Sequence, residues 1–599
     1  MRVGIDTGGT FTDFVVAHDD GSVEVFKLRS NPSDPASVIL EGLARIGGRS
    51  PEVVHGSTVA TNALLERKGA RTALVTTAGF EDVIEIGRQN RARLYDLCPP
   101  PKRVLSDPAL RFGIAERVYY DGTVERAPSE KDLRKLGRQV AAAGAESVAI
   151  CLLHSYAHPE HEKTVSKVLE NVGFRCVSHQ ISPEFREYER TSTTFLNAYV
   201  GPLMDRYIGR LGAVKRLSIM QSNGGLIHAK EAREQAVRTL LSGPAGGVIG
   251  AIDTARLSGF ERVLGFDMGG TSTDVSLSEG APRQTTEAYI DGFPVRVPML
   301  DIQTVGAGGG SIARVDEGGL LRVGPESAGA DPGPASYGNG TLPTVTDAHV
   351  VLGRVTSLLG GEMPVDRARA AAAIDTIAVR MKTTRKAAAL GIVQVANANM
   401  ERAIRSVSVE RGYDAREFAL VAFGGCGGLH ACEIAENLDI RTVIVPEQAG
   451  VLSALGMLMA DRVRDYSVAV LGQTNYEARY RELEKQARKD MRKAVLHRSA
   501  DVRYAGQSYE LNIPWGGDFH AAHAKEYGYS DGSRTTQVVT LRVRAVLPVT
   551  RLAIRATARV PMKKPVAGPA LVNDYGSTTY VPKGWKYVAD KVGNLIVSR

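Results

Sequence analysis

One short motif occurs twice in this chain of 599 residues and limits the folds that it can adopt. The first copy spans residues 3–14 and the second spans residues 264–275. In each copy, apolar residues flank a Gly-Gly pair, a pattern typical of two strands joined by a tight turn whose glycines tolerate positive φ. The positions that are identical in both copies are Gly4/Gly265, Asp6/Asp267, Gly8/Gly269, Gly9/Gly270, Thr10/Thr271, Thr12/Thr273 and Asp13/Asp274.

The repeat predicts a duplicated nucleotide-binding fold with one phosphate hairpin in each half. Glycine turns let backbone N–H groups approach phosphate oxygens, and threonine hydroxyls add donors. Asp6 and Asp267 enter the turns and can hold Mg²⁺ through water. The alternative, two ordinary hairpins, explains one copy better than it explains two. The expected phosphate-binding residues are Gly8, Gly9, Thr10, Thr12, Gly269, Gly270, Thr271 and Thr273.

Three further glycine clusters have local alternatives. In residues 420–430 a buried strand runs through Gly424, Gly425 and Gly427 into a helix, whose N-terminus suits the adenosine or phosphate edge of a nucleotide. A tight strand–helix turn is the structural alternative. Residues 242–247 open a helix, and they fit a ligand-binding loop and a helix-capping turn equally well. Residues Gly306–Ser311 fit a hinge, a lid or a ligand contact, and the sequence leaves the choice open.

Composition is that of a packed globular protein, with 43% hydrophobic and 23% charged residues. The formal charge of +8 is not clustered with aromatic residues, so we expect no nucleic-acid partner. We also expect no membrane span and no signal peptide, because no apolar stretch is long enough and a strand is predicted from Val3. Five scattered cysteines argue for a reducing, cytoplasmic location and against a zinc finger.

The order of predicted elements suggests three domains. An N-terminal lobe is expected over residues 1–180, where the strands Thr72–Thr76 and Ser147–Leu153 alternate with helices such as Glu130–Ala143. A second lobe with phosphate and adenosine loops is expected over residues 181–465. A smaller C-terminal module, with one charged helix before short strands, is expected over residues 466–599.

The paired motifs and the late glycine loop resemble the superfamily of actin, sugar kinases and heat-shock chaperone ATPases. Within it, the chain most resembles the hydantoinase A, 5-oxoprolinase and acetone carboxylase β-subunit family. Two departures are Gly428, where the family commonly has proline, and a short stretch between Asp465 and Arg503. The segments that carry the resemblance cover nearly the whole chain: 4–13, 55–69, 189–194, 221–225, 266–274, 306–311, 329–333, 337–338, 343–348, 423–430 and 503–511.

The resemblance implies two actin-like (ribonuclease H-like) α/β lobes with a small C-terminal α+β module. It also implies ATP and Mg²⁺, with Asp6 and Asp267 acting through the metal and the glycine loops holding the nucleotide. The expected function is the ATP-dependent subunit of a hydantoinase or 5-oxoprolinase-like cyclic amide hydrolase, which phosphorylates the substrate carbonyl oxygen before ring opening. A hydantoinase B-like second subunit is implied, and hence a hetero-oligomer.

Two other functions stay open at this point. One is the ATP-dependent subunit of a ketone carboxylase of the acetone or acetophenone type, and the other is a nucleotide-gated subunit without catalysis. Asp13 and Asp274 are candidates for a general base or for turn caps. His55 belongs either to the substrate side of the cleft or to a structural cap. Asp347 and His349 form a candidate metal pair that lacks a third ligand.

Overall fold

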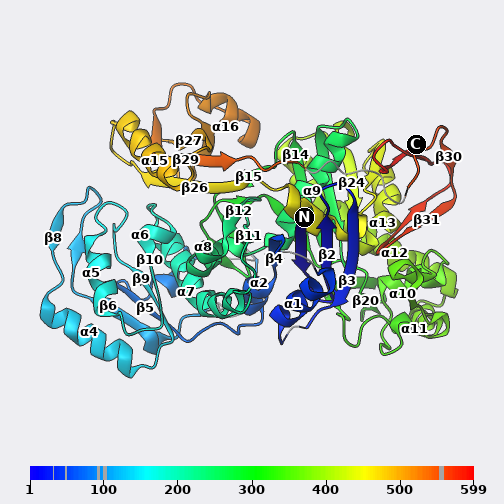
Figure 1. Ribbon diagram of the computed structural model, residues 1–599, viewed down its shortest axis with the longest axis horizontal. Coiled ribbons are helices and arrows are strands. Elements are labelled where there is room, and N and C mark those ends of the chain that lie inside the picture. The colour runs from blue at the N-terminus through cyan, green and yellow to red at the C-terminus, as the bar shows by residue number, and fades with distance from the viewer. Residues whose placement is uncertain (32, 48–49, 91–94, 97, 99–103, 552–558) are drawn as a thin grey trace.

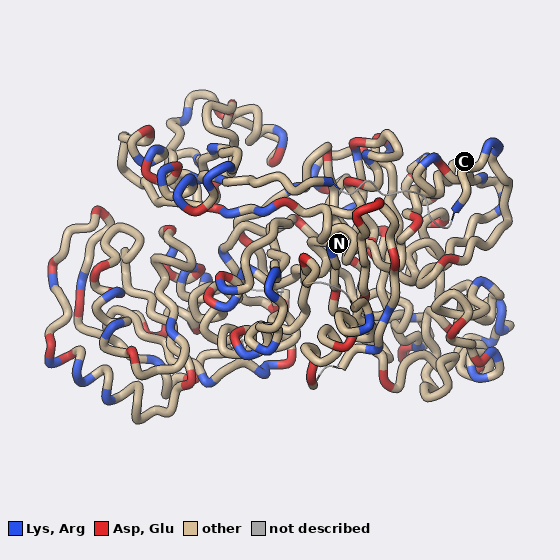
Figure 2. The backbone as a smooth tube through the Cα atoms, in the orientation of Figure 1, with Lys and Arg blue, Asp and Glu red and all other residues tan. Residues whose placement is uncertain are grey.

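The computed structural model describes residues 1–599 except 32, 48–49, 91–94, 97, 99–103 and 552–558. It is a mixed α/β protein built around a ten-stranded and an eight-stranded sheet, with helices on their faces (Figure 1). Acidic and basic residues are interspersed in every part of the chain (Figure 2). Among the described residues, no helix combines the length and the apolar character needed to span a bilayer.

The two copies of the sequence motif occupy the same place in the two large sheets. In the ten-stranded sheet, the order β3-β2-β1-β4-β11 begins with two antiparallel pairs and continues with two parallel pairs. In the eight-stranded sheet, β19-β14-β13-β24-β25 repeats this order and these directions. The strands of the first set are β1 (Arg2–Thr7), β2 (Phe11–Ala17), β3 (Val23–Arg29), β4 (Glu52–Ser57) and β11 (Leu217–Met220). Those of the second set are β13 (Arg262–Met268), β14 (Thr273–Glu279), β19 (Ile302–Val305), β24 (Ala419–Phe423) and β25 (Thr442–Val445).

Two helices cross between the sheets and pack closely on one another. They are α9 (Ser242–Leu257) and α14 (Leu452–Met459). A Cβ on Gly456 would lie 2.6 Å from the backbone nitrogen of Gly250 and still closer to the carbonyl oxygen of Gly246. Helix backbones meet this closely only where side chains are missing. Helix α14 also lies on β1, where Gly4 leaves room for the Ala454 carbonyl.

A smaller four-stranded sheet lies at one end of the molecule, farthest from the C-terminus in Figure 1. It contains β5 (Thr72–Thr77), β6 (Arg111–Ile114), β9 (Ser147–Cys151) and β10 (Phe174–Val177). Helix α4 (Glu130–Ala142) buries Leu133, Leu136 and Val140 on one stripe, as its 3.6-residue period requires. The long helix α7 (Glu187–Arg210) contacts β9 and β10 of this sheet. The predicted strands and helix of this region are therefore found close to their expected bounds.

The chain after Asp465 is divided between the two large sheets. Strands β26 (Arg462–Ala469), β27 (Val495–Tyr504), β28 (Leu511–Pro514) and β29 (Thr536–Leu547) extend the first sheet beyond β12 (Leu226–His228). Strands β30 (Val566–Ala567), β33 (Lys586–Ala589) and β34 (Leu595–Ser598) instead extend the second sheet beyond β25. The predicted module 466–599 and the boundary at residue 180 stay predictions, because strand order alone does not define domain bounds; β11 and β12 belong to the first sheet. Strand edges offer the same unpaired backbone groups everywhere, so alternation alone does not say which edge a strand joins.

The close crossing of α9 and α14 predicts that Gly456→Ala destabilises the protein. The added methyl group meets the α9 backbone, so we expect a loss of about 1–3 kcal/mol in unfolding free energy and a lower thermal midpoint. Gly209→Ala in α7 is the matched control, because no atom lies within 4 Å of its added Cβ and alanine favours helix. A Gly456→Ala variant that melts at or above the wild-type temperature contradicts the close packing.

Candidate functional site

The two hairpins bring four carboxylates together between the two large sheets. The strand register places Asp6 opposite Asp13, and Asp267 opposite Asp274. Burial raises the pKa of Asp267 well above its usual value, and the negative charges of Asp274, Asp6 and Asp13 raise it further. The carboxylates of one hairpin therefore act on those of the other. The two sequence repeats thus place their carboxylates in one cluster.

Each of these carboxyls titrates above its usual range. Burial, followed by the charge of Asp13, raises the pKa of Asp6 to about 7, although Lys27 opposes the change. Burial raises the pKa of Asp274 to about 6 against a hydrogen bond from Thr304. The pKa of Asp13 is also raised by burial, again against Lys27. A bound cation would offset this repulsion.

The donor set fits Mg²⁺ held partly by water and phosphate. Asp6 Oδ1 is buried and has no hydrogen-bond partner among the described residues, so it is available to a metal-bound water. No cluster of three or more His, Cys, Asp or Glu ligands occurs in the described part of the chain. Protein side chains alone thus do not complete a coordination shell, whereas Mg²⁺ usually keeps several waters and takes phosphate ligands.

The backbone of the Gly-Gly turns differs from the positive-φ conformation that the sequence predicted. None of Gly8, Gly9, Gly269 and Gly270 has a positive φ. A Cβ on Gly9 or on Gly270 would meet no protein atom within 4 Å. Neither backbone conformation nor protein packing requires glycine at these two positions. Bare backbone that faces open space is what close approach by a phosphate group needs.

Hydrogen bonds from neighbouring segments support the turns. Gly309 and Gly310 donate their N–H groups to the carbonyls of Gly269 (3.0 Å) and Gly270 (2.7 Å). The loop Gly306–Ser311 therefore supports the second hairpin. Thr273 and Thr12 are fully buried, and they bond to the Ala307 carbonyl (2.5 Å) and to Ser30 Oγ (3.0 Å) respectively. These two threonines lie among protein groups, which leaves Thr10 and Thr271 as the hydroxyls near the turns.

The late glycine loop lies directly beside the second hairpin. Helix α13 (Gly424–Asn437) begins immediately after β24, and a Cβ on Gly424 (φ 76°) would lie 2.5 Å from Asp267 Oδ1. The first turn of α13, with Gly425 and Gly427, therefore presents its unpaired N–H groups and positive dipole end next to this carboxylate. A helix N-terminus in this position favours an anionic group.

Lys27 is a site residue that the sequence analysis missed. Its Nζ donates to Asp13 Oδ1 (2.6 Å) and to the Gly450 carbonyl (2.7 Å), and its side chain is 9% exposed. The register of β2 with β3 places Lys27 opposite Asp13. A turn centred on Asp20 would have predicted this pairing. The lysine leaves Asp13 ion-paired while Asp6 stays unpaired.

The hydrogen bonds of His55 and of the Asp347/His349 pair go to groups other than the four carboxylates. His55 is fully buried on β4, its nitrogens contact the Ile5 carbonyl (3.1 Å) and Tyr207 Oη (2.6 Å), and burial lowers its pKa to about 4. His55 is therefore a core residue, but neither contact caps the following helix α2 (Val59–Leu65), as the structural alternative expected. The buried Asp347 accepts four hydrogen bonds and caps α10 (Val345–Val351), while His349 Nε2 lies 3.0 Å from His430 Nε2. Asp347 is therefore saturated by protein donors.

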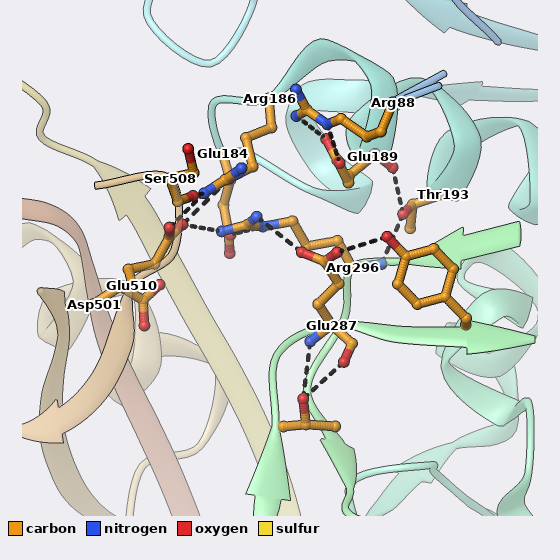
Figure 3. Close-up of polar contacts among 12 residues, drawn as sticks. Arg88, Glu184, Arg186, Glu189, Thr193, Glu287, Arg296, Asp501, Ser508 and Glu510 are labelled. Atoms are coloured by element: carbon orange, nitrogen blue, oxygen red, sulfur yellow. Dashed lines mark hydrogen bonds and ion pairs between the residues drawn. The ribbon is translucent and has the colours of Figure 1, made fainter. Parts of the chain in front are cut away.

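A cavity of about 1650 Å³ lies between β14, β19 and the strands that extend the first sheet. It reaches the exposed Thr304, whose Oγ1 donates to Asp274 Oδ1 (2.5 Å), so the cavity borders the second hairpin there. One wall is an ion-pair network in which Arg296 contacts both Glu184 and Glu510 at 2.8 Å (Figure 3). Burial opposes the ionisation of Glu184, but Arg542 and Arg296 outweigh it and lower its pKa to about 2. These ion pairs join Arg542 of β29 and Glu510, next to β28, to Glu184 and Arg296 on the opposite part of the cavity wall.

Comparison with known proteins places these features in a family. The family model for hydantoinase/oxoprolinase matches residues 190–466, and that for its N-terminal region matches residues 2–173. The chain is 34% identical to caprolactamase subunit alpha of Pseudomonas jessenii, over 98% of each protein. It is 33% identical to 5-oxoprolinase 1 of Arabidopsis thaliana, over 99% of this chain but 56% of that longer protein.

Two solved structures share the whole architecture. The crystal structure of the ATP-dependent caprolactamase from Pseudomonas jessenii superimposes with a TM-score of 0.88 at 31% identity and covers 100% of both chains. The nucleotide-free structure of acetone carboxylase gives a TM-score of 0.80 at 26% identity, covering 100% of this chain and 99% of the other. The resemblance found in the sequence is confirmed. The chain belongs to the hydantoinase/oxoprolinase family.

The raised pKa of Asp6 predicts that Asp6→Asn stabilises the metal-free protein at high pH. Above pH 7 the wild type carries an unfavourable buried charge that asparagine lacks, so unfolding free energy should rise by about 1–4 kcal/mol. The gain should shrink as pH falls from 7 to 4, since the folded protein then takes up the proton. Asp331→Asn, at an exposed position, is the matched control. Thermal melting in chelator between pH 4 and 9 provides the measurement.

Proposed function

We propose that this chain is the ATP-dependent subunit of a cyclic amide hydrolase of the hydantoinase/5-oxoprolinase type. The observation that carries the proposal is the meeting of four carboxylates from two equivalent hairpins around bare glycine turns. The shared strand order of the two sheets supports two actin-like lobes with ATP between them. One relative is an ATP-dependent caprolactamase, and both it and the 5-oxoprolinase relative are named for hydrolysis of a cyclic amide.

The proposed binding roles follow the geometry. The turns at Gly9, Thr10, Gly270 and Thr271 hold phosphate oxygens through backbone N–H groups. The start of α13 lies on the adenosine side. Asp6 and Asp267 hold the waters of Mg²⁺, which supplies charge neutralisation for the phosphates. Lys27 keeps Asp13 in place and adds a positive charge on the side of the first hairpin.

The proposed reaction places the amide carbonyl oxygen in line with the γ-phosphorus. The oxygen forms a bond to phosphorus while the bond to the ADP oxygen breaks, and the product is an imidate phosphate. The amide N–H proton passes to a base as the imidate forms. Water then attacks the imidate carbon, and the ring C–N bond of the resulting tetrahedral adduct breaks as nitrogen takes up a proton, which leaves an acyl phosphate. A second water hydrolyses the acyl phosphate to the carboxylate and free phosphate. Asp274, with a pKa of about 6, borders the cavity and is the candidate base for the amide or water proton. The cavity next to Thr304 is the proposed substrate side.

A second subunit is part of the proposal. The caprolactamase relative is itself named as a subunit, and the Arabidopsis 5-oxoprolinase continues well beyond the part that matches this chain. We infer that a hydantoinase B-like partner completes ring opening. A ketone carboxylase subunit is the alternative function, which the full-length structural match to acetone carboxylase supports.

If both hairpins serve one nucleotide, Asp6→Ala and Asp267→Ala should each lower ATP turnover by at least about a hundredfold while the protein stays folded. Loss of either carboxylate removes one side of the metal site. Asp331→Ala is the matched exposed control. Wild-type turnover in either folded variant would refute a shared site.

The substrate assignment predicts that, with the partner subunit present, cyclic amides such as hydantoins, lactams or 5-oxoproline stimulate ATP hydrolysis. Ring-opened product should form in proportion to phosphate released. The purified chain alone should not sustain ring opening over many turnovers. Stimulation by a ketone with bicarbonate, and by no cyclic amide, would move the assignment to the carboxylase function.

A further inference from the structure

The tip of a hairpin near the C-terminus lies at the candidate nucleotide site. The hairpin consists of β31 (Ala570–Asp574) and β32 (Ser577–Val581), and β32 packs along α13. The carbonyl oxygen of Gly576 lies 3.6 Å from the place that a Cβ on Gly425 would occupy. A Cβ on Gly450 would lie 2.7 Å from the same carbonyl group. The tip thus covers the start of α13, although neither large sheet includes it.

Lys27 connects this tip to the carboxylates. A Cβ on Gly576 would lie 2.9 Å from Lys27 Cε, so the lysine stem runs along the turn. The same side chain donates to Asp13 and to the Gly450 carbonyl. Three segments far apart in the sequence therefore meet at one point: β3 of the first sheet, the segment after β25, and the C-terminal hairpin. A nucleotide between the hairpins and α13 would lie beside them.

Two hydroxyls of the hairpin are buried without a partner. Ser577 is 7% exposed and Thr579 is 1% exposed, and neither Ser577 Oγ nor Thr579 Oγ1 has a hydrogen-bond partner among the described residues. Thr579 Oγ1 lies 2.7 Å from the place of a Cβ on Gly428, so it points at the first turns of α13. Buried hydroxyls are normally hydrogen-bonded. Donors and acceptors left open beside a helix N-terminus indicate a polar ligand.

Tyr575 and Gly576 form the turn of this hairpin. The Tyr575 ring is partly exposed and lies near Gly360, where an added Cβ would be 3.3 Å from Tyr575 Cδ2. Burial and the Glu362 carboxylate raise the pKa of its hydroxyl, and Asp13 adds to the rise. The side chain therefore reaches from the C-terminal hairpin towards the first sheet. An aromatic face in this position suits a flat aromatic ligand group.

We propose that the tip Tyr575–Ser577 forms the nucleoside wall of the ATP site, with the Tyr575 ring packed on the base and the Ser577 hydroxyl bonded to the nucleoside. This assignment rests on the proposed ATP-dependent function. It divides the ligand between two kinds of surface. The glycine turns and carboxylates hold the triphosphate, while the C-terminal hairpin and the start of α13 hold the nucleoside.

The test compares a nucleotide with a ligand that lacks the nucleoside. Binding of Mg²⁺–ATP and of Mg²⁺–tripolyphosphate is measured by titration calorimetry for the wild type, Tyr575→Ala, Tyr575→Phe and Ser577→Ala. Tyr575→Ala and Ser577→Ala should weaken ATP binding by roughly 5- to 50-fold and leave tripolyphosphate binding unchanged. Tyr575→Phe should keep ATP affinity within about twofold, because the ring face remains. Leu571→Ala, exposed at the far end of the same hairpin, is the control and should bind both ligands normally.

Hydrogen exchange of the wild-type protein gives a second measurement that needs no variant. ATP should slow exchange of residues 574–580, and tripolyphosphate should not. Unchanged ATP affinity in both Tyr575→Ala and Ser577→Ala, or an equal loss for both ligands, would overturn the nucleoside wall while the proposed function stands. Absence of ATP binding by the wild type would overturn both.

Discussion

The gathering of four partly buried carboxylates, which burial disfavours in their charged form, is the constraint on which the rest of the site depends. Asp6, Asp13, Asp267 and Asp274 come from two hairpins, and burial raises the pKa of each. A folded protein keeps such an arrangement at a cost in stability that ligand binding can recover. Within the described residues, Lys27 is bonded to one of the four and opposes only part of the charge. A cation with its phosphate ligand is the kind of partner that the remaining carboxylates need.

The fold brings these charges together through close helix packing. The glycines of α9 and α14 allow the two crossing helices to touch, and these helices lie against β1 and β13, whose ends carry Asp6 and Asp267. Gly243 at the start of α9 makes room for Asp6 Oδ1, since a Cβ there would lie 3.2 Å from it. Gly424 makes room for Asp267 Oδ1 in the same way, because a Cβ on it would lie 2.5 Å away. Small residues thus allow both the close packing of the two helices and the close approach of helix backbone to the carboxylates.

The sequence predicted the parts of the site that depend on local pattern. The two hairpins follow from alternation around Gly-Gly, and the glycine loop at Gly424 follows from a buried strand that precedes a helix. Pairing between distant segments has no comparable local pattern in the sequence. The division of the chain after Asp465 between two sheets depends on which strand edges are free, and the contact of Lys27 with Gly450 depends on how β3 faces the second lobe. His55 looked available because a histidine before Gly-Ser-Thr is compatible with either a cleft or a core position, and only its packing against Tyr207 favours the core.

The path of the C-terminal chain gives the two lobes a further connection besides α9 and α14. Strands β26–β29 extend the first sheet and wall the cavity that borders Asp274, while β30, β33 and β34 extend the second sheet and carry the hairpin that covers α13. Movement of one large sheet relative to the other would therefore shift both the cavity wall and the hairpin tip relative to the carboxylate cluster. The ion pairs of Arg296 and Arg542 anchor the cavity wall, and Lys27 contacts the hairpin tip, so the C-terminal chain has contacts on both sides of that cluster. Under the proposed function, a nucleotide that draws the two hairpins together would also change the space next to Thr304, which is the proposed place of the amide carbonyl.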